Sequence, residues 1–197
     1  MNWILASASP RRRDILSHLG LPFTVRVADV DEQSDEPNGA ALVELLARRK
    51  ALAVAHTLTE QEKREGTVVL AADTVVLDPD GHILGKPRDA EDARRMLRTL
   101  SGRTHSVVSG VAVWRDDTLV SAHEVTTVTF SPLDEQTVAR YVASGEPLDK
   151  AGAYGIQDTA ALWVSGICGD YFNVVGLPVH RLEQLLREHF DLSLWTE

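Results

Sequence analysis

The apolar residues near the start of the chain predict a buried strand followed by a helix. Residues 3–5 are uniformly apolar and precede a run of small residues, as at the end of a buried strand. Pro10 suits the first position of a helix, Ser9 can cap that helix, and Gly20 can end it. We therefore expect a strand, a small-residue loop and a helix.

The next part of the chain predicts a strand, a loop, a long helix and a linker. Residues 22–30 alternate apolar and polar side chains and predict a strand, whereas residues 40–57 repeat apolar side chains at helical spacing and predict a long helix. Residues 31–39 are acidic and rich in turn formers, which predicts a loop. Residues 60–66 are charged and predict a linker.

The middle of the chain predicts one buried strand, one helix and one hairpin. Residues 67–78 are nearly all apolar except for one Asp–Thr pair, as in a buried strand. Asp89 can cap a helix that extends to residue 100. Residues 105–115 and 119–130 favour strands on either side of a short turn, which predicts a long hairpin.

The last third of the chain predicts a helix over residues 134–144, a glycine-rich loop over 145–158, a second hairpin over 161–176 and a closing helix over 178–189. Strand–helix units and hairpins occur together, so the predicted fold class is α/β, with a mixed twisted sheet and flanking helices. No internal repeat is visible, and we expect a single domain over residues 1–197.

Composition and charge narrow the classes of function. With 197 residues, 44% of them hydrophobic and 25% charged, the chain is expected to be globular. A net charge of −9 argues against a nucleic-acid partner, because such binding uses many phosphate contacts. The single cysteine, Cys168, cannot form an internal disulfide, and no apolar run is long enough to span a membrane. We expect a cytoplasmic protein with no nucleic-acid or membrane partner.

Three consecutive arginines at the predicted start of the first helix indicate an anion site. A helix N-terminus is partly positive, so Arg11, Arg12 and Arg13 are unfavourable there unless a bound anion compensates. Ser7 and the free N–H groups after Pro10 would complete a phosphate site. The alternative is a solvated basic first turn, because charge runs usually lie at the surface.

Asp73 is a carboxylate in the middle of an apolar stretch. Such a group is costly to bury unless it is paired, hydrogen-bonded or bound to metal. It could bind a divalent cation that bridges phosphates, or accept a proton from an attacking water. The alternative is that Asp73 and Thr74 mark a bulge at the end of the strand.

Three further charged residues are ambiguous by themselves. Lys86 lies between a glycine and a proline, which would fix the backbone that presents it. Lys50 lies on the predicted helix over 40–57, and a single lysine is more often solvated than functional. Glu32 lies in the acidic loop and is either a metal ligand or a residue that aids solubility.

The loop at 149–158 combines residues suited to binding a flat ligand. Gly152 and Gly155 allow the backbone to approach a ligand, and Tyr154 offers a stacking face. Gln157 offers an amide that can both donate to and accept from a base edge. The alternative is a structural glycine turn with Tyr154 in the core.

Seven motifs, in order and over nearly the whole chain, resemble those of the Maf family of nucleotide pyrophosphatases. They are "LASASPRRRDIL", "LARRKA", "AADTVV", "GKPRDAEDA", "LSGRTHSV", "LDKAGAYGIQ" and "VVGLPV". The resemblance implies a fold related to that of inosine triphosphatases, with two lobes around a cleft. It also implies hydrolysis of a nucleoside triphosphate to the monophosphate and pyrophosphate, with Mg²⁺ or Mn²⁺ as the cofactor.

The resemblance further implies roles for single residues of this chain. Ser7, Arg11 and Arg12 would contact phosphates and substrate, and Glu32 and Lys50 would be polar substrate-binding residues. The implied catalytic residues are Asp73, as acid or base, and Lys86. Asp73 and Glu32 are also the expected metal ligands, whereas Arg13 has no implied role.

The resemblance extends to the subtype that acts on dTTP and UTP. That subtype carries Arg, Thr and Gln where this chain has Arg11, Thr74 and Gln157, whereas members acting on 7-methyl-GTP tend to carry an aromatic residue, Gln and Glu. A neutral Gln157 can match the donor–acceptor edge of uracil or thymine, whereas Glu would suit a cationic methylated purine. Asp158 departs from the family, which often has Gly there, and would add negative charge near the base.

Two alternatives stay open at this point. One is a purine or 7-methyl-GTP pyrophosphatase with the same fold, and the other is a nucleotide-binding regulator of cell division with little turnover. The removal of non-canonical nucleotides is the cellular purpose that the resemblance suggests. The expected partner is the nucleoside triphosphate, and a homodimer is a further option.

Overall fold

The computed structural model describes residues 1–27 and 29–195. Within them, seven strands form a sheet in which neighbours follow the order β2-β1-β3-β5-β6-β7, and β4 pairs with β3. The strands are β1 (Trp3–Leu5), β2 (Thr24–Val25), β3 (Val68–Leu77), β4 (Ile83–Leu84), β5 (Thr104–Arg115), β6 (Thr118–Phe130) and β7 (Val164–Cys168). β1 is parallel to β2 and β3, whereas β4 is antiparallel to β3 and β7 to β6. The predicted mixed α/β sheet is confirmed.

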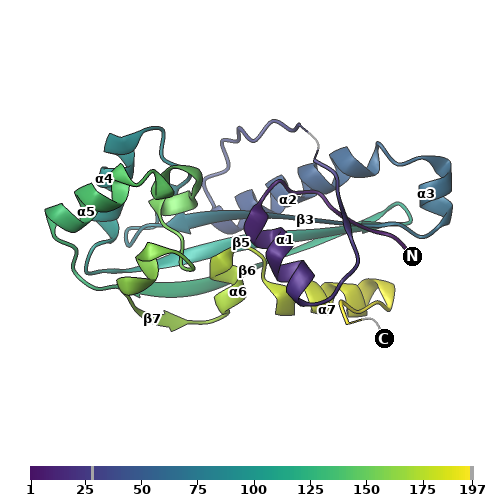
Figure 1. Ribbon diagram of the computed structural model, residues 1–197. Coiled ribbons are helices and arrows are strands. Elements are labelled where there is room, and N and C mark those ends of the chain that lie inside the picture. Colours follow the sequence, from purple (N-terminus) through teal and green to yellow (C-terminus); the bar gives the residue numbers. More distant parts are fainter. Residues whose placement is uncertain (28, 196–197) are drawn as a thin grey trace. The chain divides into compact units, whose positions relative to one another are not determined.

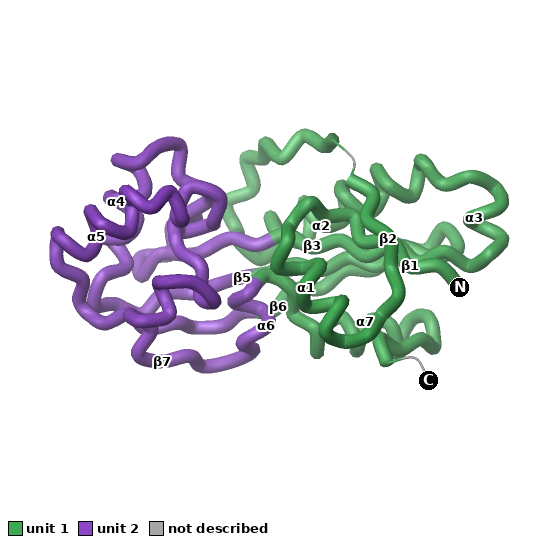
Figure 2. The backbone as a smooth tube through the Cα atoms, viewed as in Figure 1, with its two compact units in different colours: residues 1–73, 109–124, 176–197 green, residues 74–108, 125–175 purple. Residues whose placement is uncertain are grey.

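The chain divides into two compact units, drawn in different colours in Figure 2. Unit 1 comprises Met1–Asp73, Ser109–Glu124 and Gly176–Glu197, and unit 2 comprises Thr74–Val108 and Val125–Val175. Strands β3, β5 and β6 contribute residues to both units. This division agrees with the expectation of two lobes, whereas the cleft, the single domain over 1–197 and the relation to inosine triphosphatases stay predictions.

In unit 1, a long helix packs on the sheet through small residues. The α-helices of the described residues in both units are α1 (Pro10–His18), α2 (Gly39–Ala55), α3 (Glu60–Arg64), α4 (Ala90–Leu100), α5 (Glu135–Ala143), α6 (Tyr171–Val175) and α7 (Val179–Phe190), of which α1, α2, α3 and α7 belong to unit 1. Ala47 and Ala51 of α2 belong to one buried cluster with Ile4 of β1 and Val69 of β3. A Cβ atom at Gly110 of β5 would lie only 2.5 Å from the backbone of α2. The absence of this atom allows the close packing that fixes α2 on the sheet.

Helices α1 and α7 belong to the same unit, and Figure 1 shows them on the other side of its strands from α2. Pro10 is the first residue of α1, as predicted, and Ile15 and Leu16 are its buried residues. The predicted cap is wrong, because the Ser9 side chain does not cap α1. The Ser9 N–H instead donates to Ser7 Oγ at 3.2 Å, so the hydroxyl that orders this turn comes from Ser7.

In unit 2, helices α4 and α5 contact each other; α4 begins after its predicted cap, Asp89, and α5 after Asp134, where its helix is predicted to start. Asp89 Oδ1 accepts the N–H of Asp92 at 2.8 Å, and Asp134 Oδ1 accepts the N–H of Thr137 at 2.6 Å. Each cap satisfies an N–H group that the first helical turn would leave unpaired. The two predicted helices are therefore confirmed together with the residues that start them.

Unit 2 also contains a buried aromatic cluster. The Phe130 ring meets the His105 ring edge to face at 4.9 Å and the Tyr154 ring at 4.8 Å. His105 Nε2 and the Tyr154 hydroxyl are 2.8 Å apart, and both residues are buried. Burial lowers the pKa of His105 to about 4, because a charged imidazole would lose its hydration there.

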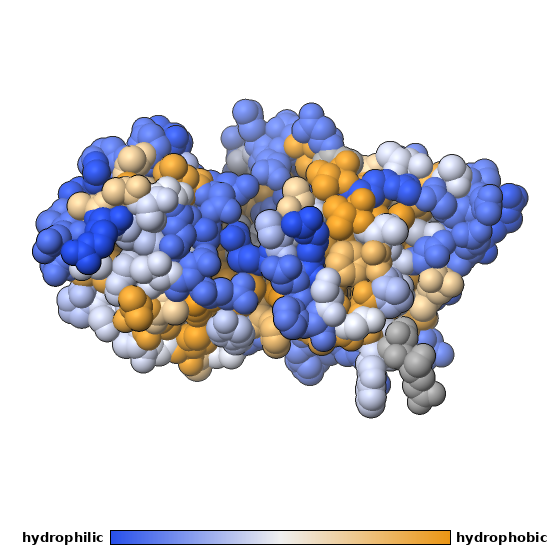
Figure 3. All heavy atoms as spheres, in the orientation of Figure 1, coloured by the Kyte–Doolittle hydropathy of each residue, from blue (hydrophilic) through white to orange (hydrophobic). Residues whose placement is uncertain are grey.

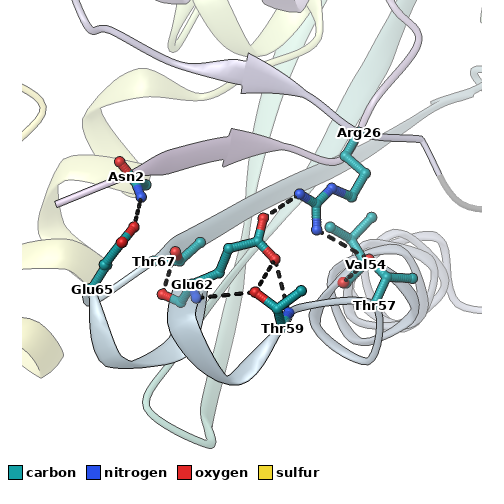
Figure 4. Close-up of polar contacts among 8 residues, drawn as sticks. All are labelled: Asn2, Arg26, Val54, Thr57, Thr59, Glu62, Glu65 and Thr67. Atoms are coloured by element: carbon teal, nitrogen blue, oxygen red, sulfur yellow. Dashed lines mark hydrogen bonds and ion pairs between the residues drawn. The ribbon is translucent and has the colours of Figure 1, made fainter.

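Two predictions about the first third of the chain are wrong. Among the described residues of the strand predicted over 22–30, only β2 is a strand, because Val25 and Val27 are exposed and give it no buried face; residue 28 of this prediction lies outside the described residues. The predicted linker over 60–66 contains the helix α3. Figure 4 shows the reason: the Thr59 hydroxyl accepts the N–H of Glu62, and Glu62 Oε2 accepts the N–H of Thr59. This reciprocal capping stabilises a short helix in a charged segment.

The second predicted hairpin, over 161–176, is also wrong in its second half. Only β7 is a strand, and it pairs with β6 in place of a following strand. After β7 the chain forms the short helix α6, because Asp170 Oδ1 accepts the N–H of Phe172 at 2.7 Å and turns the backbone. The apolar run at the end of this segment therefore belongs to a helix.

The surface is mostly hydrophilic on the face drawn in Figure 3, with small hydrophobic patches. This distribution agrees with the net charge of −9. Among the described residues, no helix combines the length and the apolar character needed to cross a bilayer.

Candidate active site

The core of the candidate site is a lysine that lies between two carboxylates in unit 1. Lys50 Nζ donates to Asp73 Oδ1 at 2.6 Å and is also 2.6 Å from Glu32 Oε1. The side chains of Lys50 and Asp73 are only 15% and 14% exposed, whereas that of Glu32 is 56% exposed. The partner that a carboxylate in an apolar strand requires is therefore a lysine from α2. β3 continues beyond Asp73 to Leu77, so Asp73 does not mark the end of the strand.

The first turn of α1 places a second cation, Arg12, beside this group. Arg12 Nη1 donates to Ser7 Oγ at 3.1 Å, and Arg12 Nε donates to the Gly176 carbonyl at 2.8 Å. Ser7 is buried, and its hydroxyl also accepts the N–H of Ser9. The first helical turn is therefore no freely solvated basic segment, because Arg12 is fixed by two directed hydrogen bonds.

Arg12 and the group formed by Lys50, Asp73 and Glu32 interact electrostatically. Burial lowers the pKa of Arg12 from its ordinary value, the carboxylates of Asp73 and Glu32 oppose that shift, and Arg11 adds to it. The three cationic side chains Arg11, Arg12 and Lys50 outnumber the two carboxylates by one. In a protein of net charge −9, a local excess of positive charge favours a small polyanion.

The three consecutive arginines differ in exposure. Arg11 and Arg12 are half-buried, whereas Arg13 is exposed. Arg11 is close enough to Arg12 to affect its pKa. The structure therefore separates Arg11 and Arg12 from Arg13 by exposure, and their roles toward a substrate stay a prediction.

The remaining expected site residues belong to unit 2. Lys86 is exposed and follows β4, in a loop whose Gly85 carbonyl accepts the N–H of Gly152 at 3.0 Å. This hydrogen bond joins the loop of Lys86 to the glycine loop that contains Gln157, which is also exposed. Thr74 is half-buried on β3, directly after Asp73. Unit 2 thus brings the loops of Lys86 and Gln157 together through their backbones.

Two expectations about the glycine loop change. Tyr154 is buried and its hydroxyl pairs with His105, so it offers no stacking face, and the alternative of a core tyrosine holds. Asp158 is no unpaired negative charge, because its Oδ2 lies 3.4 Å from Nζ of the buried Lys150. The glycine loop is therefore held by buried groups and presents Gln157 at its surface.

The carboxylates of unit 1 suit a divalent cation that arrives with a phosphate chain. Within residues 1–27 and 29–195, no group of three or more His, Cys, Asp or Glu side chains could hold a metal ion. Mg²⁺ commonly uses only one or two carboxylates together with substrate phosphates and water. Glu32 and Asp73 fit that pattern in number, because they are two carboxylates brought close together by their shared contact with Lys50.

Sequence reasoning missed two groups that shape these sites. The Gly176 carbonyl orients Arg12, and no side chain in the sequence could reveal a backbone acceptor 164 residues away. Lys150 was missed although it is buried, and the signal was a lysine enclosed by glycines and acidic residues in "LDKAGAYGIQD".

These features define an α/β protein with a charged site that suits a phosphate-bearing substrate. The chain belongs to the Maf family, because the family model described as "Maf-like protein" matches residues 2–189. The resemblance seen in the seven sequence motifs is thereby confirmed.

Curated relatives match the chain over nearly its whole length. The "dTTP/UTP pyrophosphatase" of Symbiobacterium thermophilum is 51% identical over 98% of this chain and 96% of its own. Those of Moorella thermoacetica, at 51% identity over 98% and 96%, and Alkaliphilus oremlandii, at 46% over 97% and 97%, carry the same name. A solved structure of the Staphylococcus aureus Ham1 protein shares 14% identity, with a TM-score of 0.47 over 66% of this chain and 72% of that chain. That structural likeness is too weak to assign a fold.

Proposed function

We propose that this protein is a metal-dependent nucleoside triphosphate pyrophosphatase that hydrolyses dTTP and UTP to the monophosphate and pyrophosphate. The observation that supports the chemistry best is the pair formed by Lys50 and Asp73 at 2.6 Å beside Arg12. The names of relatives that are 46% and 51% identical over nearly the whole chain support the choice of substrate.

In this proposal Asp73 is the general base. Its carboxylate accepts a proton from water as that water attacks the α-phosphorus, and the bond from the α-phosphorus to the bridging oxygen breaks. Pyrophosphate leaves with the electron pair of that bond. Lys50 fixes Oδ1 of Asp73, which holds the carboxylate in one orientation throughout the attack.

The cationic residues compensate the charge of the triphosphate. Arg11 and Arg12 bind phosphate oxygens through their planar guanidinium groups, and Lys86 contributes a further positive charge. Ser7 orients Arg12 and contacts substrate. Glu32 and Asp73 would hold Mg²⁺ or Mn²⁺, which supplies phosphate charge neutralisation when bound.

The choice of base is assigned to two neutral residues of unit 2. The Gln157 amide matches the acceptor–donor edge of uracil and thymine, and Thr74 supports that choice. CTP inverts one donor–acceptor pair of this edge and should be a poor substrate. A cationic base such as 7-methylguanine gains nothing from a neutral amide.

The test is pyrophosphate release by the purified full chain from dTTP, UTP, CTP, ATP, GTP and 7-methyl-GTP, with Mg²⁺, with Mn²⁺ and with a chelator. We expect dTTP and UTP to be hydrolysed well ahead of the others, and the chelator to stop turnover. Faster release from a purine substrate would replace the pyrimidine assignment by the purine alternative. Nucleotide binding without release would favour a regulator.

The same assay bears on the cellular role. Modified pyrimidine triphosphates added to the substrate panel would show whether they are preferred over dTTP and UTP, as removal of non-canonical nucleotides requires. The cytoplasmic location and the homodimer stay predictions, which microscopy of a tagged chain and light scattering of the purified protein would check.

A further inference from the structure

We propose that Asp158 is a specificity-determining positioning residue, because its ion pair with Lys150 fixes the backbone that presents Gln157. This proposal rests on the proposed function, in which Gln157 selects the base. It concerns the loop 146–159 of unit 2, where the groups that hold the loop are charged and their partners come from the loop itself.

Lys150 is the centre of this loop. Its Nζ donates to the Glu146 carbonyl at 2.6 Å and to Asp149 Oδ1 at 2.9 Å, and it lies 3.4 Å from Asp158 Oδ2. The Lys150 side chain is only 8% exposed. A buried ammonium is stable only when it is paired, so these partners are held to it strongly.

A second pair of contacts closes the loop from its other end. Glu146 Oε1 accepts the N–H of Thr159 at 3.1 Å, and Glu146 Oε2 accepts the Thr159 hydroxyl at 2.9 Å. The residue that follows Asp158 is therefore tied to the residue whose carbonyl binds Lys150. Residues 146 and 159 form the base of the loop, and Lys150 lies inside it.

The Asp158–Lys150 pair packs directly over Gly155. A Cβ atom at Gly155 would lie 2.5 Å from Asp158 Oδ2 and 2.6 Å from Lys150 Cε, so the two charged side chains occupy the space above this glycine. The N–H of Asp158 also donates to the Gly155 carbonyl at 3.1 Å. Asp158 is thus fixed by its side chain and by its backbone.

Gln157 lies between two fixed neighbours. Ile156 before it is 7% exposed, Asp158 after it is held by Lys150, and Gln157 itself is exposed. Its backbone direction is therefore set by its neighbours, and its amide is free to face a ligand. Loss of the Asp158 carboxylate would release one neighbour and widen the range of positions of the amide.

The test compares the ratio of kcat/KM for dTTP to that for CTP in four forms of the full chain: wild type, Asp158→Ala, Gln157→Ala and the double variant. We expect Asp158→Ala to lower this ratio roughly tenfold, because base selection depends on the placement of one amide. If Asp158 acts through Gln157, the double variant should discriminate as poorly as Gln157→Ala and no worse. Asp158→Glu, which retains the carboxylate, should recover part of the ratio.

Amide hydrogen exchange of residues 150–159 supplies a readout that does not depend on turnover. Exchange should be faster in Asp158→Ala than in wild type, and Asp80→Ala should change neither exchange nor the ratio, because Asp80 only forms an exposed ion pair with Arg103 in the same unit.

Three outcomes would overturn the proposal. The first is an unchanged dTTP-to-CTP ratio in Asp158→Ala, and the second is unchanged hydrogen exchange in the loop. The third is a double variant whose ratio falls by the product of the two single-variant decreases. A wild type that turns over dTTP and CTP equally would instead overturn the base assignment within the proposed function and leave the pyrophosphatase assignment in place.

Discussion

The expected site residues of unit 1 and those of unit 2 are held in different ways. In unit 1, the side chains of Lys50 and Asp73 are largely buried and bind each other directly. In unit 2, Lys86 and Gln157 are exposed, and the contacts that fix their loops come from backbone groups and from the buried Lys150. In the proposed function, the charges of Lys50 and Asp73 are therefore preorganised by pairing, whereas the Gln157 amide that would select the base lies exposed on a loop held by its neighbours.

The largest effect is expected from Asp73→Asn, which tests the paired group of unit 1. The variant keeps the shape but loses the basic oxygen and the charge that Lys50 binds. We expect kcat to fall by about 10²- to 10⁴-fold, the range for loss of a general base, with folding retained. Steady-state pyrophosphate release and thermal unfolding would measure both. Asp80→Asn is the matched control, and near-wild-type turnover of Asp73→Asn would remove this residue from the mechanism.

Much of the candidate site in unit 1 could be predicted from the sequence, because some of its residues stand where they cost free energy unless something compensates them. Asp73 interrupts an apolar strand and Arg11 and Arg12 oppose the helix dipole, and both arrangements require compensation. The partner Lys50 could not be identified by such reasoning, since one lysine on a charged helix resembles any other. Its role depends on the packing of α2 against β3, which only the fold determines.

The unit 2 loops were less predictable because their order depends on tertiary contacts. The sequence allowed Tyr154 to be either a stacking residue or a core residue, and its pairing with the distant His105 decides for the core. The prediction of a linker in place of helix α3 was wrong for a different reason. Thr59 and Glu62 form a capping box, which is a local signal that the charged composition obscured. The main strands and long helices were predicted, since their apolar periodicity is strong.

The second largest effect is a loss of stability at acid pH, and it comes from His105 in unit 2. Burial lowers the pKa of His105 to about 4, whereas an unfolded histidine has a pKa near 6.5. Between these values the unfolded chain binds a proton that the folded chain does not. The free energy of unfolding should therefore fall as the pH drops from 6.5 to 4, by about 3 kcal/mol in total.

Urea unfolding of the full chain at several pH values would measure this loss. His105→Gln keeps a polar group beside Tyr154 but cannot take up the proton, so the curve of stability against pH should become flatter between 6.5 and 4. An equally steep curve in the variant would show that other groups cause the acid sensitivity.

The third prediction tests whether the cations of unit 1 bind phosphates. Arg11→Ala removes one guanidinium group, and a hydrogen bond to a charged group contributes about 1.5–3 kcal/mol. We expect the Kd for dTTP to rise by roughly 10- to 100-fold. Arg13→Ala is the matched control, because Arg13 follows in the same helix but is exposed. Titration calorimetry with an uncleavable analogue would decide, and equal affinities in both variants would contradict the anion site.

The fourth prediction changes the unit 2 amide and leaves the charges of unit 1 in place. Gln157→Glu should leave a base carbonyl facing a carboxylate, and an unsatisfied buried group costs about 1–3 kcal/mol. We expect kcat/KM for dTTP and UTP to fall accordingly, with little effect on folding. The comparison includes CTP and 7-methyl-GTP for both forms of the chain. If wild type treats all four substrates alike, the pyrimidine assignment is lost and the pyrophosphatase assignment remains.

The smallest effect is expected at Glu62 in unit 1. Protonation of Glu62 should lower the free energy of unfolding at a lower pH than protonation of His105 in unit 2. Hydrogen bonds from Arg26 and from the Thr59 backbone and hydroxyl lower the pKa of Glu62 to about 2 (Figure 4). An unfolded glutamate has a pKa near 4.3, so the contribution of Glu62 to stability is present above that value and is lost as the pH falls toward 2.

Glu62→Gln should lower the urea midpoint modestly at pH 7, because partly exposed ion pairs contribute little. The difference from wild type should shrink between pH 4.3 and 2, below the window of His105. Glu65→Gln is the control, because Glu65 accepts only from the neutral amides of Asn2 and Gln61. A difference that stays constant with pH would show that Glu62 stabilises α3 by shape and not by charge.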